Sequence, residues 1–170
     1  MKRTLRKILI AIGTCFTVVS NNYANGYPLA TDVETIDALV AAYYEVVSGP
    51  IGYNYNAARD ESLHAPHAII SRTNDNGLTQ RHNFQTEQTT IEVPYTKGFF
   101  EVEIGRITEQ YGTLAHVWST FEIRNTEDGP AVSRGINSLS IYWDEGRWWI
   151  SSWSTHPEGN KELPSKYINR

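Results

Sequence analysis

Two glutamates on one predicted strand are the first candidates for chemistry. Glu101 and Glu103 lie two residues apart within the segment 99–110, and alternate residues of a strand point to the same side. If that side is enclosed, desolvation and like-charge repulsion raise the pKa of at least one carboxyl, which makes it a candidate catalytic group for proton transfer near neutral pH. If that side faces water, the alternation with Val102 and Ile104 is that of any half-exposed strand. The spacing leaves both interpretations open.

Two histidines, His64 and His67, lie three residues apart across a predicted helix end. His64 is a candidate catalytic base, helped by Tyr43 or Tyr44 of the preceding helix as ligand-binding groups. The alternative is that both histidines are ordinary polar groups of a helix end and a turn. No third ligand follows at a spacing typical of a metal site, and we expect no metal.

Arg134 and Asn137 form a third candidate, a ligand-binding pair. A guanidinium fork and an amide could together bind a carboxylate or an oxyanion. Arginine on a strand is more often an ion-pair partner, and Glu101, Glu122 and Asp144 are the available acids. The sequence contains no Ser-His-Asp order, phosphate loop or dinucleotide fingerprint. We therefore expect any catalysis to need no cofactor.

The amino-terminal segment predicts export. Four basic residues within the first seven precede an apolar run over residues 8–19, which is too short to cross a bilayer but suits the core of a signal peptide. Cleavage is expected near Ser20 or Ala24, so residues 1–24 are assigned to a signal peptide. Lipidation at Cys15, inside the run, is the weaker alternative. The mature protein is expected in the periplasm or outside the cell, with no membrane attachment.

Removal of this segment makes the chain more acidic. It takes four of the 15 basic residues and leaves 11 against 19 acidic ones, a net charge of −8. Such a surface repels nucleic acid and anionic lipid, so neither is expected as a partner. The single cysteine, Cys15, leaves as well, and the mature chain therefore has neither disulfide nor thiol chemistry.

The remainder predicts one domain over residues 28–160 and a carboxy-terminal tail over residues 161–170. The segment Thr31 to Glu34 has the pattern of a capping box and predicts the start of a helix that ends at Gly49-Pro50. A shorter helix is expected over residues 56–64. Beyond Pro66 the pattern alternates, and the expected strands cover residues 68–71, 78–84, 99–110, 114–125, 131–143 and 147–155. The segment 85–95 is ambiguous, and a short helix that ends at Pro94 is one interpretation. Helices followed by a long antiparallel sheet indicate the α+β class.

These elements resemble the NTF2-like superfamily. The resemblance covers about residues 31–158. It rests on the capped first helix, on the segment Ser62-Leu63-His64-Ala65-Pro66-His67-Ala68, and on a closing hairpin that runs from Arg134-Gly135-Ile136-Asn137-Ser138 through Gly146-Arg147-Trp148-Trp149-Ile150. The strands at residues 98–103 and 115–119 resemble an uncharacterised bacterial branch.

The resemblance implies a cone, in which a strongly curved sheet wraps around the helices and leaves a cavity at its open end. Members include nuclear transport factor 2, ketosteroid isomerases, SnoaL-type polyketide cyclases and scytalone dehydratase, so the fold by itself does not give the function. The residue patterns of the ketosteroid isomerase and scytalone dehydratase sites have no clear match in this sequence. Neither activity is assigned.

The closing hairpin indicates which strand residues face the cone interior. If the turn at residues 144–146 pairs Trp143 with Trp148, then Asn137 and Ser152 lie toward the open end as ligand-binding groups, with Ser119 on the neighbouring strand. The outer face then carries a set of apolar side chains: Val102, Ile104, Trp118, Tyr142, Trp149 and Trp153. We expect a homodimer to bury this face.

Three functions fit these observations. The leading interpretation is a protein that binds a small, partly apolar molecule in the cone cavity. The second is a cofactor-free isomerase, cyclase or hydro-lyase in which Glu101, Glu103 or His64 moves a proton. The third is a dimeric interaction module whose cavity is filled by side chains.

Overall fold

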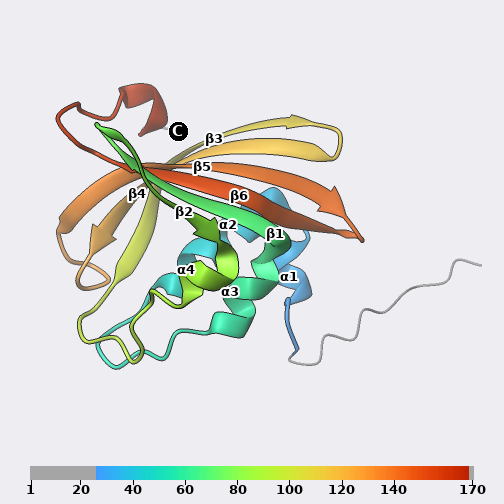
Figure 1. Cartoon of the computed structure of the whole chain (residues 1–170), viewed down its shortest axis with the longest axis horizontal. Helices are drawn as coiled ribbons and strands as arrows, with labels where there is room; N and C mark the ends of the chain where they lie inside the picture. The colour runs from blue at the N-terminus through green and yellow to red at the C-terminus, as the bar shows by residue number, and fades with distance from the viewer. Residues whose placement is uncertain (1–25, 169–170) are drawn as a thin grey trace, which may run out of the picture.

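The chain forms a six-stranded sheet that curls around a group of short helices (Figure 1). The computed structural model describes residues 26–168, so the predicted signal peptide lies outside the described residues. In chain order the elements are α1 (Ala30–Val33), α2 (Ile36–Val47), α3 (Ala57–Leu63), β1 (His64–Asn74), β2 (Gly77–Asn83), α4 (Phe84–Gln88), β3 (Phe100–Tyr111), β4 (Leu114–Arg124), β5 (Ala131–Asp144), β6 (Arg147–Pro157) and the 3-10 turn η1 (Ser165–Tyr167). The α+β class is confirmed. Across residues 26–168, no helix is both long and apolar enough to cross a membrane.

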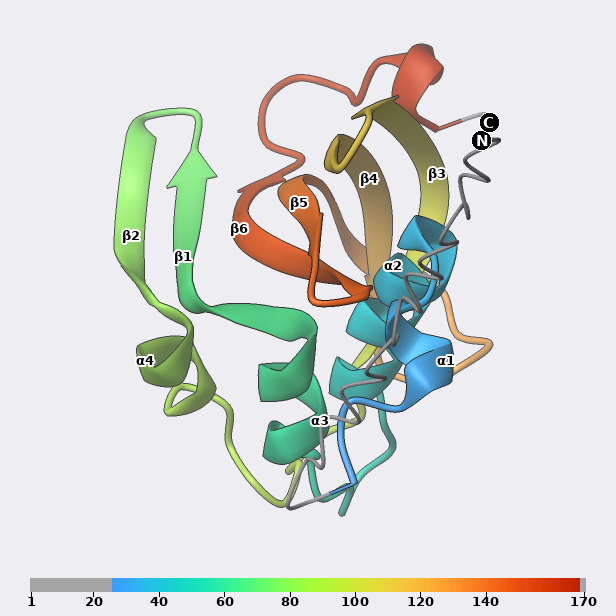
Figure 2. The same ribbon diagram turned by 90° about the vertical axis from the view of Figure 1, so that its right-hand side faces the viewer.

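The strand order is β2-β1-β6-β5-β4-β3. Four of the neighbouring pairs are antiparallel, but β1 and β6 run parallel. The expectation of an entirely antiparallel sheet is therefore wrong at one pair. Hydrophobic alternation predicts strands and faces but does not encode the direction of a partner far away in the chain. Figure 2 shows the long strands curving past α2 while β1 and β2 stand beside them.

The first long helix begins later than the capping-box pattern predicts. Thr31 lies within the single turn α1, which has no side-chain cap. The cap of α2 is Thr35, whose Oγ1 accepts the Ala38 N–H at 3.0 Å. Both threonines precede the apolar stripe, and either could serve as an N-cap. The prediction of the short helix is confirmed, because Asn56 Oδ1 caps α3 by accepting the Arg59 N–H at 3.0 Å.

The core lies between α2 and the inner face of the sheet. Leu39 and Val40 of α2 are fully buried, as are Val117, Leu139 and Ile150 of three successive strands. The predicted pairing of Trp143 with Trp148 is confirmed. Burial of this apolar stripe supplies most of the driving force for folding and fixes α2 against the strands that carry the polar residues described below.

A bulge in β6 changes which side chains face inward after Ile150. Ile141 pairs with Ile150, whereas the preceding residue Ser140 pairs with Ser152, so β6 contains one extra residue at this point. An extra residue reverses the alternation beyond it. Trp153 is consequently buried against the core instead of lying on the outer face as predicted.

The carboxy-terminal segment lies against the outer face of the sheet. The Tyr167 ring is 5.7 Å from the Trp118 ring. A Cβ atom at Gly105 would lie 2.2 Å from the Tyr167 carbonyl oxygen, so this approach requires glycine. The chain itself thus covers part of the apolar outer face.

Candidate functional site

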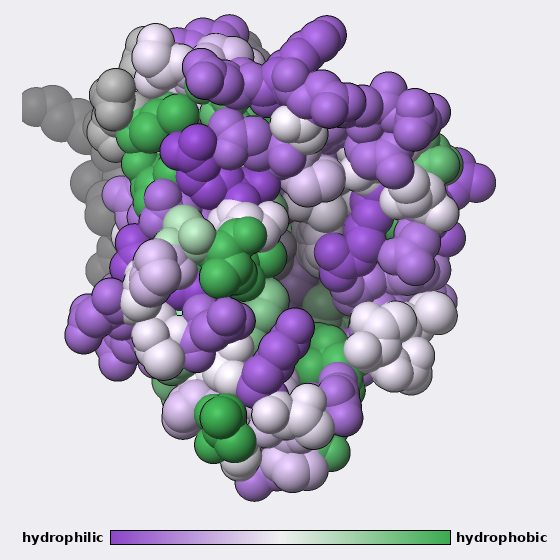
Figure 3. Space-filling view, turned by 90° about the vertical axis from the view of Figure 1, so that its left-hand side faces the viewer, coloured by the Kyte–Doolittle hydropathy of each residue, from purple (hydrophilic) through white to green (hydrophobic). Residues whose placement is uncertain are grey.

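A cavity of about 420 Å³ lies between the helices and the inner face of the sheet. Its aromatic lining consists of Tyr43, Phe84, Tyr95, Phe99, Phe121 and Trp153. Its polar lining includes Asp60, His64, Arg72, Glu101 and Asn137. The surface is hollowed on the side of the molecule that lies left in Figure 1, and residues of both characters surround the hollow (Figure 3). The cone is therefore not filled by its own side chains.

The helix wall of the cavity is formed by Asp60 of α3 and by His64, the first residue of β1. Both residues are only 3% exposed. The Tyr55 hydroxyl donates to Asp60 Oδ2 at 2.5 Å, and His64 Nδ1 lies 2.9 Å from the Asp60 carbonyl oxygen. Since a carbonyl can only accept, Nδ1 carries the proton and Nε2 keeps its lone pair. Asp60 Oδ1 and His64 Nε2 have no hydrogen-bond partner among the described residues.

Burial sets the protonation of this pair. Burial raises the pKa of Asp60 to about 7, and the negative charge of Glu87 adds to this rise. The hydrogen bond from Tyr55 lowers the same pKa and opposes the rise. Burial lowers the pKa of His64 to about 4. The imidazole is therefore neutral at physiological pH, and Asp60 changes its charge there. Phe84 stacks on the His64 ring with 3.9 Å between centroids, which keeps the imidazole dry.

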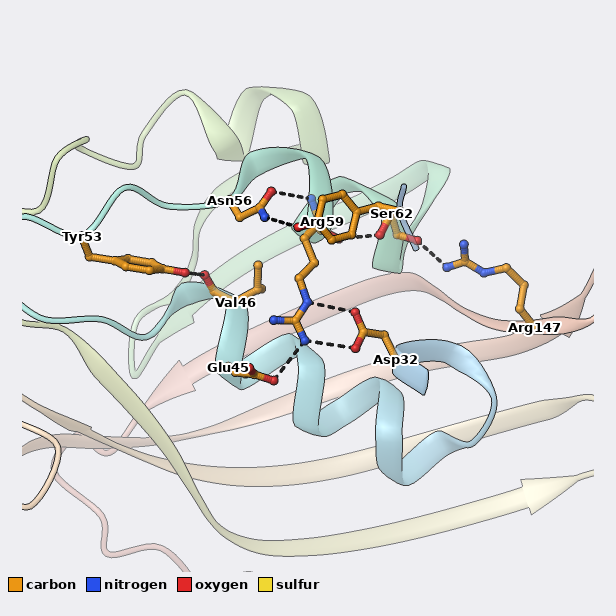
Figure 4. A network of polar contacts seen from close by, with 9 residues as sticks. Asp32, Glu45, Val46, Tyr53, Asn56, Arg59, Ser62 and Arg147 are labelled. Carbon is orange, nitrogen blue, oxygen red and sulfur yellow. Dashed lines mark hydrogen bonds and ion pairs between the residues drawn. The ribbon is translucent and has the colours of Figure 1, made fainter. Parts of the chain in front are cut away.

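Ion pairs fix the helix that carries Asp60. Arg59 donates to both carboxylate oxygens of Asp32 at 2.9 and 3.0 Å, and to Glu45 Oε2 at 3.0 Å. It thereby joins α3 to α1 and α2 (Figure 4). Arg147 of β6 donates to the Ser62 carbonyl at the end of the same helix. A helix of under two turns is not stable by itself, so these contacts hold the helix wall in place.

The sheet wall is formed by Glu101 of β3 and Asn137 of β5. Asn137 Nδ2 donates to Glu101 Oε1 at 3.3 Å. Burial raises the pKa of Glu101 to about 7, and the Asn137 hydrogen bond and the charge of Arg72 oppose that rise. Ser48 ties β3 to the end of α2, because its hydroxyl donates to the Tyr44 carbonyl at 2.7 Å and accepts the Glu101 N–H at 3.0 Å.

A chain of hydrogen bonds leads from this wall into the core. Asn137 Nδ2 also donates to the Tyr44 hydroxyl oxygen at 3.3 Å. The Tyr44 hydroxyl lies 2.7 Å from Ser119 Oγ, and Ser119 donates to Glu103 Oε1. Because the Ser119 hydroxyl donates its proton to Glu103, Ser119 must accept from the Tyr44 hydroxyl. From Asn137 onward, each group therefore donates to the next along the path to Glu103. Burial raises the pKa of Tyr44 well above its ordinary range, so its hydroxyl stays protonated.

Glu101 and Glu103 have different surroundings although both side chains point inward. Glu103 is held by Arg106, which donates to its carboxylate from Nε at 2.9 and 3.2 Å and from Nη2 at 2.5 Å. Arg106 also reaches Asp37 at 2.6 Å. Glu101 lines the cavity and Glu103 does not. The two carboxylates therefore do not form the like-charge pair that their spacing suggested.

The other candidates are divided between the cavity and the rest of the molecule. Tyr43 lines the cavity, and burial together with the charge of Glu101 raises its pKa well above the ordinary value. Arg134 lies outside the lining and binds Glu158 at 2.9 and 3.1 Å. Ser152 also lies outside the lining, beyond the β6 bulge. His67 stacks on Tyr142 with 6.1 Å between ring centroids.

Asp60 is the residue that sequence reasoning missed. It lies four positions before His64 on the predicted short helix, and residues at that spacing share a helix face. The spacing of Asp60 and His64 was therefore a signal in the sequence that could have identified the pair. Arg72 and Glu87, which bind each other, were missed too, because they lie on separate elements. Within residues 26–168, no three His, Cys, Asp or Glu side chains are arranged to hold a metal ion.

The sequence matches no protein-family model. A search of curated proteins finds no match either.

Similar solved structures do exist. A Nostoc punctiforme protein of unknown function with a cystatin-like fold has a TM-score of 0.57 at 11% identity, covering 74% of this chain and 90% of its own. An NTF2-like protein of unknown function from Shewanella baltica has a TM-score of 0.51 at 14% identity, covering 72% and 90%. A chain assigned as the beta subunit of an aromatic-ring-hydroxylating dioxygenase from Novosphingobium aromaticivorans has a TM-score of 0.58 at 11% identity, covering 78% and 93%. Such identities show a shared fold and carry no function.

Proposed function

The chain has the NTF2-like cone fold, and we propose that it binds a small, partly apolar organic molecule in the cavity of that cone. The observation that carries the proposal is the lining, in which aromatic rings surround a few buried polar groups. Ligand sites generally combine an apolar wall with a small number of polar groups that fix orientation. The cavity volume of about 420 Å³ falls within the range of about 300–1,000 Å³ found for such sites.

The cavity also weighs against the interaction-module hypothesis. That hypothesis needs a solid cone, in which side chains occupy the interior. Here Tyr43, Phe84 and Trp153 stand around a space instead of filling it. Leaving apolar walls apart costs packing energy, and this cost is offset if a ligand occupies the space.

The binding proposal can be tested with a matched pair of tryptophan variants. Ile123 lines the cavity, whereas Thr108 is exposed on the neighbouring strand. Ile123→Trp is expected to fill the cavity and to weaken binding of a neutral fluorescent dye such as Nile red at least about tenfold. Thr108→Trp adds the same ring elsewhere and should leave the affinity unchanged. Native mass spectrometry of the purified protein, followed by denaturing extraction, identifies any molecule that co-purifies. Equal dye binding by both variants would contradict the proposal.

Proton-transfer catalysis is the second candidate function, favoured by two observations. Glu101, whose pKa is raised to about 7, and His64, whose Nε2 has no partner among the described residues, line the same cavity. A group with a pKa near the working pH is suited to general acid–base catalysis. A cofactor-free isomerase, cyclase or hydro-lyase would show a bell-shaped pH profile that Glu101→Gln abolishes. Turnover that survives this substitution unchanged would exclude the role of Glu101.

We also propose that the protein acts after export, as a homodimer. The dimer proposal is supported by two partly exposed side chains of the predicted outer face, Val102 and Tyr142. Light scattering at micromolar concentration tests it, with Val102→Lys expected to give monomers. Fractionation of cells that express the full chain tests export. The exported protein is expected to have the mass of a chain cleaved after residue 20 or 24.

A further inference from the structure

Three residues that line the cavity each have a buried polar atom without a hydrogen-bond partner among the described residues. Two of these atoms, Asp60 Oδ1 and His64 Nε2, lie where α3 runs into β1, and the third is Trp153 Nε1 of β6. Asp60 and His64 are one helical turn apart, and each is 3% exposed. Asp60 Oδ2 and His64 Nδ1 are used within the fold, by Tyr55 and by the Asp60 carbonyl respectively. Asp60 Oδ1 and His64 Nε2 have no hydrogen-bond partner among the described residues. Asp60 Oδ1 lies 3.5 Å from His64 Nδ1 and makes no hydrogen bond with it. An unsatisfied buried polar atom is costly, so two acceptor atoms on neighbouring lining residues favour a ligand that supplies donors.

The chemistry of these two atoms restricts the ligand group. His64 Nε2 is an acceptor because the proton resides on Nδ1, and Asp60 Oδ1 is an acceptor once the carboxyl is ionised. A hydroxyl has one proton and can satisfy only one of them. A carboxylate has none and would add negative charge beside Asp60. An ammonium group has three N–H donors and can satisfy both.

The charge of the lining favours a cation. Four acidic residues, Asp60, Glu87, Glu92 and Glu101, line the cavity against two basic ones, Arg72 and Lys97. Arg72 is already bound by Glu87, and Lys97 is exposed at the surface. The deep carboxyls of Asp60 and Glu101 have no lysine or arginine within ion-pair distance among the described residues.

Aromatic rings complete the surroundings. The Tyr43 ring lies 6.2 Å from the His64 ring and 6.1 Å from the Trp153 ring, and Phe84 stacks on His64. Aromatic faces attract cations, and the attraction is stronger where water is excluded. The Arg72 guanidinium already lies over Trp153, 5.3 Å from the ring centroid, and His64 covers one face of Phe84, so Tyr43 is the ring that remains for an ammonium group. The same rings offer apolar surface to the body of a ligand.

We infer that the Asp60–His64 corner binds the ammonium group of a small apolar amine, whose body lies among the aromatic rings of the cavity. The inference rests on the proposed function, since it specifies the ligand of the same cavity. Asp60 supplies the counter-ion and His64 Nε2 supplies a second acceptor.

Ligand binding is linked to pH through the corner itself. Asp60 is surrounded by titratable and charged groups from several elements: Tyr55 before α3, Tyr43 of α2, His64 and Arg72 of β1, Glu87 of α4, Tyr95 before β3 and Glu101 of β3. Because the pKa of Asp60 is about 7, an ammonium ligand displaces its proton at and below neutral pH. Affinity for the amine should therefore fall as the pH drops from 8 to 6, while affinity for a neutral ligand should not.

Isothermal titration calorimetry with three small ligands tests the inference, because the ligands share a phenyl ring and differ in their polar group. The probes are 2-phenylethylamine, 2-phenylethanol and phenylacetate, titrated into the mature wild-type protein. The amine is expected to bind at least about tenfold more tightly than the alcohol, and phenylacetate is expected not to bind. Titration in two buffers with different ionisation enthalpies should show proton release with the amine and none with the alcohol. This second readout needs no variant.

Asp60→Asn provides the matched change, with circular dichroism and the melting temperature as checks on folding. This substitution should weaken binding of the amine about tenfold or more, and the affinity for the alcohol should stay within about twofold of the wild-type value. Asp37→Asn, which removes an exposed carboxylate beside Arg106, is the control and should alter neither. Alcohol or phenylacetate binding as tight as amine binding would overturn the inference and leave the proposed function standing. Failure of all three probes and of Nile red would overturn both.

Discussion

The polar pair of the sheet wall, Glu101 and Asn137, is hydrogen-bonded in a different way from the pair of the helix wall, Asp60 and His64. The comparison concerns these two pairs, since Trp153 Nε1 on β6 also has no partner among the described residues. On the sheet wall, Glu101 joins a continuous chain of hydrogen bonds that ends at the ion pair of Glu103 with Arg106. On the helix wall, Asp60 and His64 each leave one atom unpaired among the described residues. A satisfied network rigidifies the fold, whereas an unsatisfied one is a cost that folding alone does not explain. In the proposed function, the sheet wall therefore orients the ligand and the helix wall bonds to it.

The largest effect is expected from loosening the helix wall. Arg59→Ala leaves Asp32 without its bidentate partner, and the Asp32 side chain is only 7% exposed. Loss of a partner from a mostly buried ion pair should lower the free energy of unfolding by about 3 kcal/mol. Thermal unfolding measures the change. Arg124→Ala, which breaks the more exposed pair with Glu122, is the control and should cost under about 1 kcal/mol. Equal losses would show that α3 is held by something else.

A smaller effect is expected from the charge of Glu101. Its pKa in the folded protein is about 7, against an ordinary value of 4.5, so between these values the folded state binds more protons than the unfolded chain. The stability that this preference contributes is present below pH 4.5 and is lost as the pH rises through 7. His64 acts in the opposite direction, because its lowered pKa costs stability as the pH falls through 6.5.

Comparing Glu101→Gln with the wild type isolates the contribution of Glu101 to the pH dependence of the free energy of unfolding. The variant should be more stable than the wild type by about 2 kcal/mol at pH 8, or on the order of 5 °C in Tm, with a smaller gain at pH 5. Denaturant unfolding at both pH values measures it. A gain of the same size at both would show that Glu101 titrates in its ordinary range.

A subtler effect is expected from the network of the sheet wall. Asn137→Leu keeps the approximate volume of the side chain but removes the N–H that lowers the pKa of Glu101. The pKa of Glu101 should therefore rise further above 7, as followed by carbon NMR of the labelled carboxyl. Ser119→Ala interrupts the network two hydrogen bonds beyond Asn137 and should produce a smaller rise of the Glu101 pKa. A pKa that stays constant or falls in Asn137→Leu would refute the assigned hydrogen bond.

The smallest effect is expected from Arg134, which belongs to neither wall. It pairs with Glu158 outside the cavity lining, so Arg134→Gln should leave Nile red affinity within about twofold. Fluorescence titration is the measurement. A loss of tenfold or more would restore the ligand-binding role that the sequence suggested for this arginine.

Sequence reasoning identified the sheet wall better than the helix wall for a physical reason. Strand alternation and one hairpin register were enough to predict that Asn137 faces inward. The same argument failed at Ser152 and Trp153, because a bulge is set by local backbone geometry that alternation does not report. The role of Glu103 could not be predicted either, since its partner Arg106 follows an irregularity in the pairing of β3 between Glu103 and Gly105. Contacts between separate elements, such as Arg72 with Glu87, have no sequence period at all.

The fold was more accessible than the site. Element types followed from the change of hydrophobic period at Pro66, and the closing hairpin carried the resemblance to the cone fold. The parallel pairing of β1 with β6 and the cap at Thr35 depend on tertiary contacts, which overrule local propensity. Site chemistry depends on single atoms, and it becomes visible only once Asp60 and His64 are placed in space.

Nitrogen NMR of the His64 imidazole tests the central claim most directly, because it reports the protonation of each ring nitrogen. The account predicts a neutral ring with the proton on Nδ1 and an unprotonated Nε2 down to about pH 5, given a pKa lowered to about 4. Addition of 2-phenylethylamine should then shift Nε2 and leave Nδ1 almost unchanged. A His64 that is protonated at pH 6, or that carries its proton on Nε2, would contradict the claim that the helix wall presents open acceptors to a ligand.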